Sequence, residues 1–312
     1  MHPWGAREQP LWPRVSVVIP CLNRPHLLER AVRSVYEQDY PGDVECIVVL
    51  DDPQASAPRG PEKLHRSLIT LRNERKQGLA GARNHGALVA TGGLVAFLDD
   101  DDEWLPVKLR LQVEALHAHS EAAAVGCGIV VVYRKRQIER LTDELVTFDD
   151  LVRSRQMVVH SSTILVRRED LLGRIGLVSE EIPGGASEDY EWQLRAARQG
   201  PIIVVQRPLA QIRWHEGSFY ARNWETFVAG LHFVLEHNPE FRRDPRGLAR
   251  ILGQIAFAKA AGGKRKEAVI WAWRCLAANW RQPRGYLALA VAARLVSAEL
   301  ILHRLHLHGR GV

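Results

Sequence analysis

Three short apolar runs rich in β-branched residues dominate the first hundred residues, and each of them ends in a polar cluster. They read VSVVI over residues 15–19, CIVVL over 46–50 and LVAFL over 94–98, and residues 67–71 form a weaker fourth run. Runs of this length and composition predict strands that are buried on both faces. The first hundred residues therefore predict the core of a sheet, with the first strand ending at Pro20.

Helical periodicity fills the intervals between these runs, over residues 26–36 and 79–90. Strands that alternate with helices predict an α/β fold in which a mostly parallel, Rossmann-like sheet is covered by helices on both faces. Ligands of such sheets bind beyond the carboxyl ends of the strands. The polar clusters that follow Ile19, Leu50 and Leu98 meet at that edge, so we expect the functional site there.

The pattern changes beyond about residue 120. Residues 124–133 and 162–166 predict two further strands, and residues 189–198 predict a helix. From about residue 226 onward the periodicity is helical throughout. The sheet should therefore be followed by a C-terminal helical extension.

Within this extension, residues 262–263 and 282–283 separate three helices. Trp271, Trp273 and Trp280 fall in the middle one, and we expect them in the core of a small helical bundle rather than on a sugar-binding platform. The last helix is expected over residues 286–302.

That last segment is apolar but carries Arg294 and Glu299. It is too interrupted to span a membrane, which needs about 20 mostly apolar residues. A helix that lies in the membrane interface is the alternative. The first fourteen residues also lack the apolar stretch of a signal peptide, so we expect a cytoplasmic protein.

Composition describes a globular chain, with 312 residues, 46% hydrophobic and 25% charged. The four cysteines, Cys21, Cys46, Cys127 and Cys275, are scattered without a CxxC pair, which argues against disulfides and structural zinc.

The net charge of +6 is unevenly distributed. Residues 242–312 contain fourteen Lys/Arg and three Asp/Glu, whereas the rest contains twenty-eight and thirty-three. A basic tail on an acidic body favours an anionic partner such as a membrane surface, but it is equally compatible with a solvated helical face. Without aromatic residues at a recognised spacing, nucleic acid is not expected as a partner.

The run Asp99 to Asp102 is the strongest chemical signal. A helix expected from near Pro106 explains the last of these acids, because acids before a helix N-terminus are favoured by its dipole. It does not explain Asp99 and Asp101, which point the same way if the strand continues. Two carboxylates on one face suit Mg²⁺ or Mn²⁺ with a diphosphate, so we prefer a metal site.

Five segments, in order along residues 15–218, resemble those of family 2 glycosyltransferases, whose fold is called GT-A. The segments are VSVVIPCLNR (15–24), VVLDD (48–52), GLAGARNHG (78–86), FLDDDDEWLPVKL (97–109) and SEDYEWQLRAA (187–197). They resemble the opening strand with its P-x-x-N loop, the strand with the donor-binding aspartate, the ARN-x-G segment, the D-x-D region and the E-D segment. One such match is weak, but five in order are specific.

The resemblance implies roles for the donor side of the site. Pro20 and Asn23 would line the donor site, and Asp51, or alternatively Asp52, would hydrogen-bond the base or ribose. Arg83 would contact the uracil, the diphosphate or a neighbouring aspartate, since a guanidinium suits all three.

The acidic segments take the remaining roles that the resemblance implies. Asp101 would ligate the metal together with Asp99, while Asp99 and Asp100 would hold the donor sugar and ribose. Asp189 would be the catalytic base, with Glu188 beside it. For Glu188 and Asp189 the alternative is that they only cap the following helix.

Arg213, His215 and Ser218 match an R-x-H-x-x-S element that family members often carry on a mobile loop near the diphosphate. The string QIRW at 211–214 is one residue short of the Q-x-x-R-W signature of processive synthases, and long transmembrane segments are absent from the sequence. We therefore expect transfer of single sugars. The family's usual D-D-G-S reads DDPQ at 51–54, which leaves UDP as the expected nucleotide but does not establish it.

Together these features predict an inverting, metal-dependent transferase that acts in cell-surface polysaccharide or glycolipid synthesis. Residues 1–120 would bind the nucleotide sugar, 121–225 would bind a glycan or lipid-linked acceptor and carry the base, and 226–312 would form the basic helical region. That region would allow peripheral contact with the inner face of the membrane.

Two alternatives stay open. A sugar nucleotidyltransferase should have a glycine-rich loop after the first strand, where this chain reads PCLNR at 20–24. A non-catalytic binding protein on a decayed transferase scaffold should have lost an acid from 99–102 or 188–189, and none is missing.

Overall fold

The structure is a computed structural model that describes residues 12–60, 62–214 and 223–307. Its sheet half contains the elements β1 Val15–Cys21, α1 Pro25–Tyr36, β2 Val44–Leu50, β3 Arg66–Arg72, α2 Leu79–Val89, β4 Leu94–Phe97, β5 Glu103–Trp104, α3 Lys108–Ala118, β6 Ala124–Tyr133, β7 Arg136–Arg140, β8 Leu145–Val146, α4 Phe148–Arg153, η1 Ser161–Thr163, β9 Leu165–Arg167, α5 Arg168–Leu172, η2 Pro183–Gly185, α6 Glu188–Gln199 and β10 Ile202–Trp214. The helical half contains α7 Trp224–His237, η4 Pro239–Arg243, α8 Pro245–Ala261, α9 Arg265–Ala278, α10 Pro283–Ala292 and α11 Ala298–Leu307.

One mixed sheet forms the core, in the order β3-β2-β1-β4-β9-β6-β10-β5, with β7 on β6 and β8 on β10. Strands β1 to β4 pair in parallel, as do β6 and β10, whereas β9 is antiparallel to both of its neighbours. Every residue of β1 and β2 is buried, which the uninterrupted apolar runs predict. The predicted α/β fold is confirmed, and β1 extends through Pro20 instead of ending before it.

Helix α2 packs unusually close to β1 and β2, because Gly86 faces them. A Cβ added at Gly86 would lie 2.4 Å from Cγ1 of Val18 and 3.1 Å from Cγ2 of Val49. The close approach places Arg83, one turn earlier in α2, beneath the carboxyl edge of the sheet. The expected helix over 79–90 is confirmed as α2.

The segment after α4 differs from its prediction. A strand was expected over residues 162–166, but residues 161–163 form the 3-10 helix η1 and only Leu165–Arg167 form the strand β9. The side chain of His160 accepts from the N–H of Ser162 and so favours the turn over the strand.

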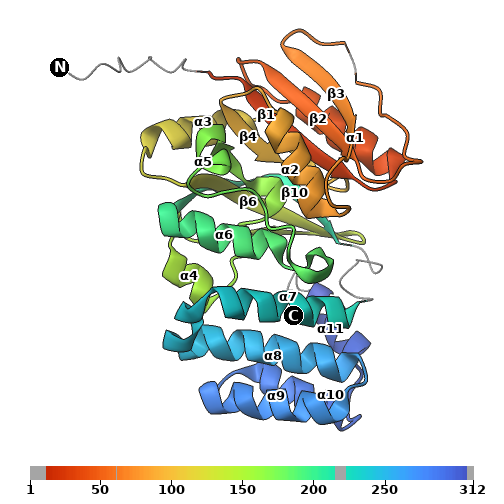
Figure 1. The fold of residues 1–312 in the computed structure, drawn as a ribbon, viewed down its shortest axis with the longest axis vertical. Helices are drawn as coiled ribbons and strands as arrows, with labels where there is room; N and C mark the ends of the chain where they lie inside the picture. Colours follow the sequence, from red (N-terminus) through yellow and green to blue (C-terminus); the bar gives the residue numbers. More distant parts are fainter. Residues whose placement is uncertain (1–11, 61, 215–222, 308–312) are drawn as a thin grey trace, which may run out of the picture.

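The helical half extends away from the sheet. Figure 1 shows α7, α8 and then α9 with α10 stacked in successive layers, so that α9 and α10 lie at the end of the molecule opposite the sheet. The chain then returns, since His306 of α11 lies 5.2 Å from Trp214 at the end of β10, measured between ring centroids. The breaks expected at 262–263 and 282–283 are confirmed, but the last expected helix is two helices, α10 and α11.

Two of the three tryptophans expected in a core are on the surface. Trp271 packs against the buried cluster, whereas Trp273 and Trp280 are 63% and 66% exposed. The prediction was wrong because α9 presents its small residues inward, among them Ala268 and Ala272. Among the residues that the structure describes, no helix is both long and apolar enough to cross a membrane.

Candidate active site

The acidic run forms a tight turn at the carboxyl end of β4, which ends two residues before the run. The N–H of Asp102 donates to the carbonyl of Asp99 at 3.1 Å. The expectation that Asp99 and Asp101 point the same way in a continuing strand is therefore wrong. The helix expected near Pro106 begins at Lys108, so Asp102 does not cap it.

The turn instead brings Asp99 together with Asp102 and His160. One carboxylate oxygen of each aspartate and one ring nitrogen of His160 lie within 4.8 Å of one another. The Oγ of Ser162 donates to Oδ2 of Asp102 at 2.6 Å, which connects the turn to η1. Asp99 was predicted as part of the site, but Asp102, His160 and Ser162 were not, although the polar HSST segment before an apolar run was visible in the sequence.

Asp102 is buried and already hydrogen-bonded within the protein. Its Oδ1 accepts from the N–H of Arg213 at 3.0 Å. Burial, with added repulsion from Asp99 and Asp101, raises the pKa of Asp102 well above its ordinary value. Asp102 therefore resists ionisation beside the neighbouring carboxylates, and a bound cation would offset the repulsion between them.

Arg83 joins the acidic turn to the start of α6. Its side chain is 3% exposed, and its guanidinium donates to Oδ1 of Asp99 at 2.6 Å and to Oε1 of Glu188 at 2.7 Å. Residues 83 and 188 are far apart in the sequence, so only the fold brings them together. The contact of Arg83 with a neighbouring aspartate is one of the three that the sequence predicted.

The pKa values of the two acids that Arg83 bridges are shifted in opposite directions. Burial alone would raise the pKa of Asp99, but Arg83 and then His160 outweigh it and hold that pKa below its ordinary value. For Glu188 burial is stronger than the attraction of Arg83, and the neighbouring Asp189 adds repulsion, so the pKa rises to about 7.

Asp189 lies at the N-terminal end of α6 beside Glu188. Its Oδ2 accepts from Nη2 of Arg155 at 2.6 Å, while the buried Oδ1 has no hydrogen-bond partner among the described residues. Burial would raise the pKa of Asp189, but Arg155 and His160 lower it overall. A cavity of about 20 Å³, lined in part by Asp189, Arg83 and Gln193, has room for about one water.

A second arginine that the sequence did not single out, Arg24, covers the outer side of the acidic turn. It pairs with both Asp100 and Asp101, and its Nη1 lies 2.6 Å from Oδ2 of Asp101. Asp100 is buried while Asp101 is partly exposed, with a side-chain exposure of 19%. Burial raises the pKa of Asp100 despite the attraction of Arg24.

The residues expected around the nucleoside lie at the ends of β1 and β2. Asp51 accepts from the N–H of Gly78 at 2.9 Å and from Nδ2 of Asn73 at 2.6 Å. Gly78 has a φ of 125°, which favours glycine at this position. Nδ2 of Asn23 donates to Oδ2 of Asp52 at 3.0 Å, so the first loop and the second strand end face each other.

Arg213 is in β10, not on a mobile loop as expected. Its guanidinium donates to Oε1 of Glu103 at 2.6 Å from Nη2, and β10 pairs with β5 beside the acidic turn. Arg213 thus lies next to Asp102 through its backbone and next to Glu103 through its side chain. His215 and Ser218 lie outside the described residues.

The fold and the site together define a GT-A protein. A mostly parallel sheet carries an aspartate-rich turn, a buried arginine and an Asp189 side chain at its carboxyl edge. S. aureus TarS 1–349, solved in complex with UDP-GlcNAc, matches 95% of this chain over 92% of its own length, with a TM-score of 0.62 and 16% identity. PcManGT from Pyrobaculum calidifontis, a mannosyltransferase solved with GDP-Man and Mn²⁺, matches 96% of this chain over 86% of its own length, with a TM-score of 0.56 and 21% identity.

The sequence family described as "Glycosyl transferase family 2" matches residues 16–175, slightly more than half of the chain. The chain belongs to this family. A GalNAc(5)-diNAcBac-PP-undecaprenol β-1,3-glucosyltransferase from Campylobacter jejuni is 39% identical over 97 residues, which are 30% of this chain. The match spans 31% of the length of that relative.

Proposed function

We propose that this protein is an inverting, non-processive glycosyltransferase that moves a sugar from a nucleoside-diphosphate sugar, with UDP as the first candidate nucleotide, to an acceptor hydroxyl. The observation that carries the proposal is the Arg83 bridge between Asp99 and Glu188. It holds the acidic turn against the start of α6, so that Asp189 and Asp99 are close enough for their charges to repel each other. Asp99, on the donor side, and Asp189, the proposed base, are thereby kept at one site.

Asp189 is the proposed catalytic base. A hydroxyl becomes a good nucleophile when a base removes its proton during attack. The lowered pKa of Asp189 keeps its carboxylate ionised at neutral pH, and its Oδ1 has no hydrogen-bond partner among the described residues. A single base and direct displacement at the anomeric carbon invert its configuration, through an oxocarbenium-like state as in glycoside hydrolysis.

Mn²⁺ or Mg²⁺ is the proposed cofactor, held by Asp101 and Asp99. Such ions prefer carboxylate oxygens and keep several waters and phosphate oxygens as ligands. Asp101 is partly exposed and pairs with the exposed Arg24, whereas Asp102, one of the other candidate ligands, is buried and hydrogen-bonded to Ser162 and the backbone of Arg213. When bound, the ion would offset the negative charge that develops on the departing diphosphate.

The remaining site residues are proposed to hold the donor. Pro20, Asn23 and Asp51, with Asp52 as the alternative to Asp51, would contact the nucleoside. Asp100 and Arg213 would contact the ribose, the sugar or the diphosphate. His215 and Ser218 stay predictions for the diphosphate loop.

The acceptor is proposed to be a glycan or a lipid-linked sugar in cell-surface polysaccharide or glycolipid synthesis. The C. jejuni relative is named for an acceptor on diphosphoundecaprenol, which supports a lipid-linked acceptor. A lipid-linked acceptor implies action at the cytoplasmic face of the membrane, with peripheral contact through the basic C-terminal helices.

Thermal unfolding with UDP, GDP, dTDP and CMP, each with Mn²⁺ or EDTA, tests the donor site. A ligand that binds only the folded state stabilises it, by about 2.7 kcal/mol at a hundred times its Kd. We expect a metal-dependent rise in Tm with UDP. No shift with any nucleotide, in a folded protein, would favour a non-catalytic protein on this scaffold.

Asp189→Asn tests the base. Loss of a general base should lower turnover by about 10²- to 10⁴-fold, while the Tm shift with UDP and Mn²⁺ should persist. Turnover is measured as UDP released from UDP-sugars with polyprenyl-diphosphate-linked acceptors. Asp149→Asn, at an exposed position of α4, is the matched control. Undiminished turnover in the Asp189 variant would remove this residue from the mechanism.

A further inference from the structure

Helix α9 lies at the end of the molecule farthest from the sheet (Figure 1), and exposed residues recur along it. Lys266, Ile270, Trp273, Ala277 and Trp280 are all exposed and follow one another at intervals of four and three residues. This spacing places Lys266, Ile270, Trp273 and Ala277 on one side of the helix, and Trp280 follows just after the helix has ended at Ala278. We call these five residues the α9 face.

The α9 face exposes three large apolar side chains. Trp273 and Trp280 are 63% and 66% exposed, and Ile270 is 54% exposed. Contiguous exposed apolar residues mark interaction sites, whereas single ones do not. Tryptophan in particular is enriched where one side of a surface is apolar and the other is wet, as at a membrane interface.

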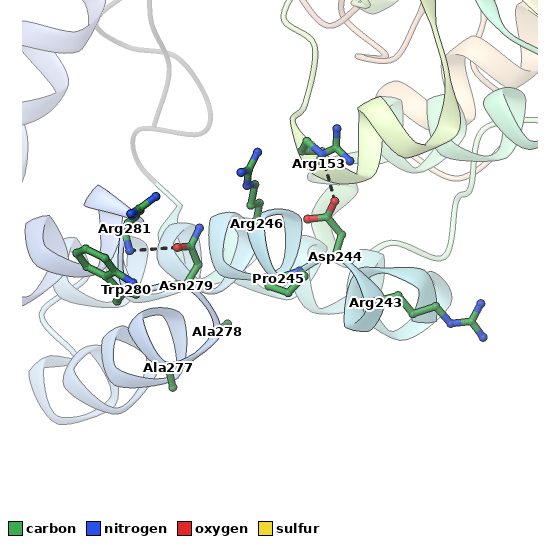
Figure 2. Close-up of a pocket in the computed structure, with 10 residues that line it drawn as sticks. All are labelled: Arg153, Arg243, Asp244, Pro245, Arg246, Ala277, Ala278, Asn279, Trp280 and Arg281. Atoms are coloured by element: carbon green, nitrogen blue, oxygen red, sulfur yellow. Dashed lines mark hydrogen bonds and ion pairs between the residues drawn. The ribbon is translucent and has the colours of Figure 1, made fainter.

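A basic groove of about 700 Å³ adjoins the α9 face and shares Trp280 with it (Figure 2). Four arginines line this groove, namely Arg153, Arg243, Arg246 and Arg281. They come from the end of α4, the junction of η4 with α8 and the segment after α9, so three parts of the chain converge on it.

The acid that lines the groove, Asp244, is already engaged. Its Oδ1 accepts from the N–H of Gly247 and caps α8, and its Oδ2 lies 3.3 Å from Nε of Arg153. Arg243, Arg246 and Arg281 form no ion pair with any residue that the structure describes. Arg281 lies over the ring of Trp280, with its Cζ 5.0 Å from the ring centroid. The groove therefore combines positive charge with an aromatic wall.

A second copy of this chain does not suit this surface. Residues 242–312 contain fourteen basic and three acidic residues. Two copies related by a twofold axis would therefore bring like charges together. An anionic lipid surface complements both properties, because its headgroups attract arginine and its interface accepts tryptophan.

We propose that the α9 face and the adjoining groove dock this protein on an anionic membrane. Trp273, Trp280 and Ile270 enter the interface, and Arg243, Arg246 and Arg281 contact headgroup phosphates. This docking surface would bring the protein to a lipid-linked acceptor, and only that role rests on the proposed function. Its test does not require turnover.

The experiment measures co-sedimentation of the full chain with vesicles of phosphatidylcholine, alone and mixed with phosphatidylglycerol. We expect binding to the mixed vesicles that weakens as salt increases. Each basic residue at such a surface contributes about fivefold to affinity, so Arg243→Gln, Arg246→Gln and Arg281→Gln together should lower binding by about a hundredfold. Trp273→Ala with Trp280→Ala should lower it at least about tenfold, also at high salt.

Matched controls come from the sheet half. Arg33→Gln, Arg59→Gln and Arg207→Gln remove the same charge from exposed positions and should change binding only slightly. The Tm without ligand reports that every variant is folded, and the Tm shift with UDP and Mn²⁺ tests the proposed function separately.

Three outcomes would overturn the proposal. One is absence of binding to the mixed vesicles by folded wild-type protein, whether or not it responds to UDP and Mn²⁺. Another is binding to soluble polyphosphate but not to vesicles, which would identify a soluble polyanion as the partner. The third is vesicle binding that the control arginine variants reduce as much as the groove variants do.

Discussion

The candidate active site and the basic groove use arginine in opposite ways. In the sheet half, Arg83 and Arg155 are each held by a carboxylate of the candidate site at 2.6–2.7 Å. In the helical half, Arg243 and Arg246 line an open groove and form no ion pair with any described residue.

The difference separates two functions of the same side chain. A buried guanidinium must be compensated for its lost hydration, and Asp99 and Glu188 do this for Arg83, so the Arg83 bridge is part of the fold as well as of the site. An exposed guanidinium keeps its hydration and can exchange it for a ligand phosphate. Substitution of a buried, paired arginine should therefore alter stability, and substitution of an exposed groove arginine should alter only binding.

The largest effect is expected from Arg83→Leu. It leaves Asp99 and Glu188 buried without their common cation, which should lower the free energy of unfolding by about 3–5 kcal/mol. Urea unfolding measures this change. Arg243→Leu is the matched control and should stay within about 0.5 kcal/mol. A cost below about 1 kcal/mol for Arg83→Leu would contradict the distinction between the halves.

Glu188 should give the sheet half a specific pH dependence. Its pKa is raised to about 7, so the folded state binds a proton that the unfolded state releases above about pH 4.5. The free energy of unfolding should therefore fall between about pH 4.5 and 7, by at most about 1.4 kcal/mol per pH unit from this group. Urea unfolding across this range should show a smaller fall for Glu188→Gln. Equal slopes would mean that Glu188 titrates normally.

Arg24→Gln should distinguish the two candidate sets of metal ligands. Arg24 pairs with Asp100 and Asp101, so it competes with a cation for Asp101. Its removal should tighten Mn²⁺ binding without nucleotide by about tenfold, measured by the electron paramagnetic resonance of unbound Mn²⁺. Arg33→Gln is the control. An unchanged affinity would favour Asp99, Asp102 and His160 as the ligands instead.

The smallest effect is expected from Arg243→Gln combined with Arg246→Gln. Neither side chain forms an ion pair with a described residue, so the free energy of unfolding should change by less than about 0.5 kcal/mol. A rise of this size would be consistent with relief of repulsion between the arginines. A loss above about 1 kcal/mol would show that the groove is structural.

Much of the fold could be predicted from the sequence, because its signals are local. The apolar runs of β1, β2 and β4 specify buried strands by composition alone, and residues 262–263 interrupt the helices by their own conformational preference. The candidate site was predicted in part, through motif resemblance, since Asp189 and Arg83 lie in recognisable segments. Whether they act as proposed is for the experiments above.

Other features depended on contacts between distant segments. The partners of Arg83, the position of His160 beside Asp102 and the pairing of Arg155 with Asp189 all join segments that no periodicity connects. The 3-10 turn at 161–163 also overrode a strand pattern, because its polar side chains bond within the turn.

The sequence by itself determined the alternation of strands and helices over the first hundred residues, the position of the acidic run and the excess of positive charge near the C-terminus. Only the tertiary structure decided which acids face each other and which tryptophans are exposed. The physical reason is that secondary structure follows from the spacing of neighbouring residues. Burial and charge pairing depend on which surfaces the whole chain brings into contact.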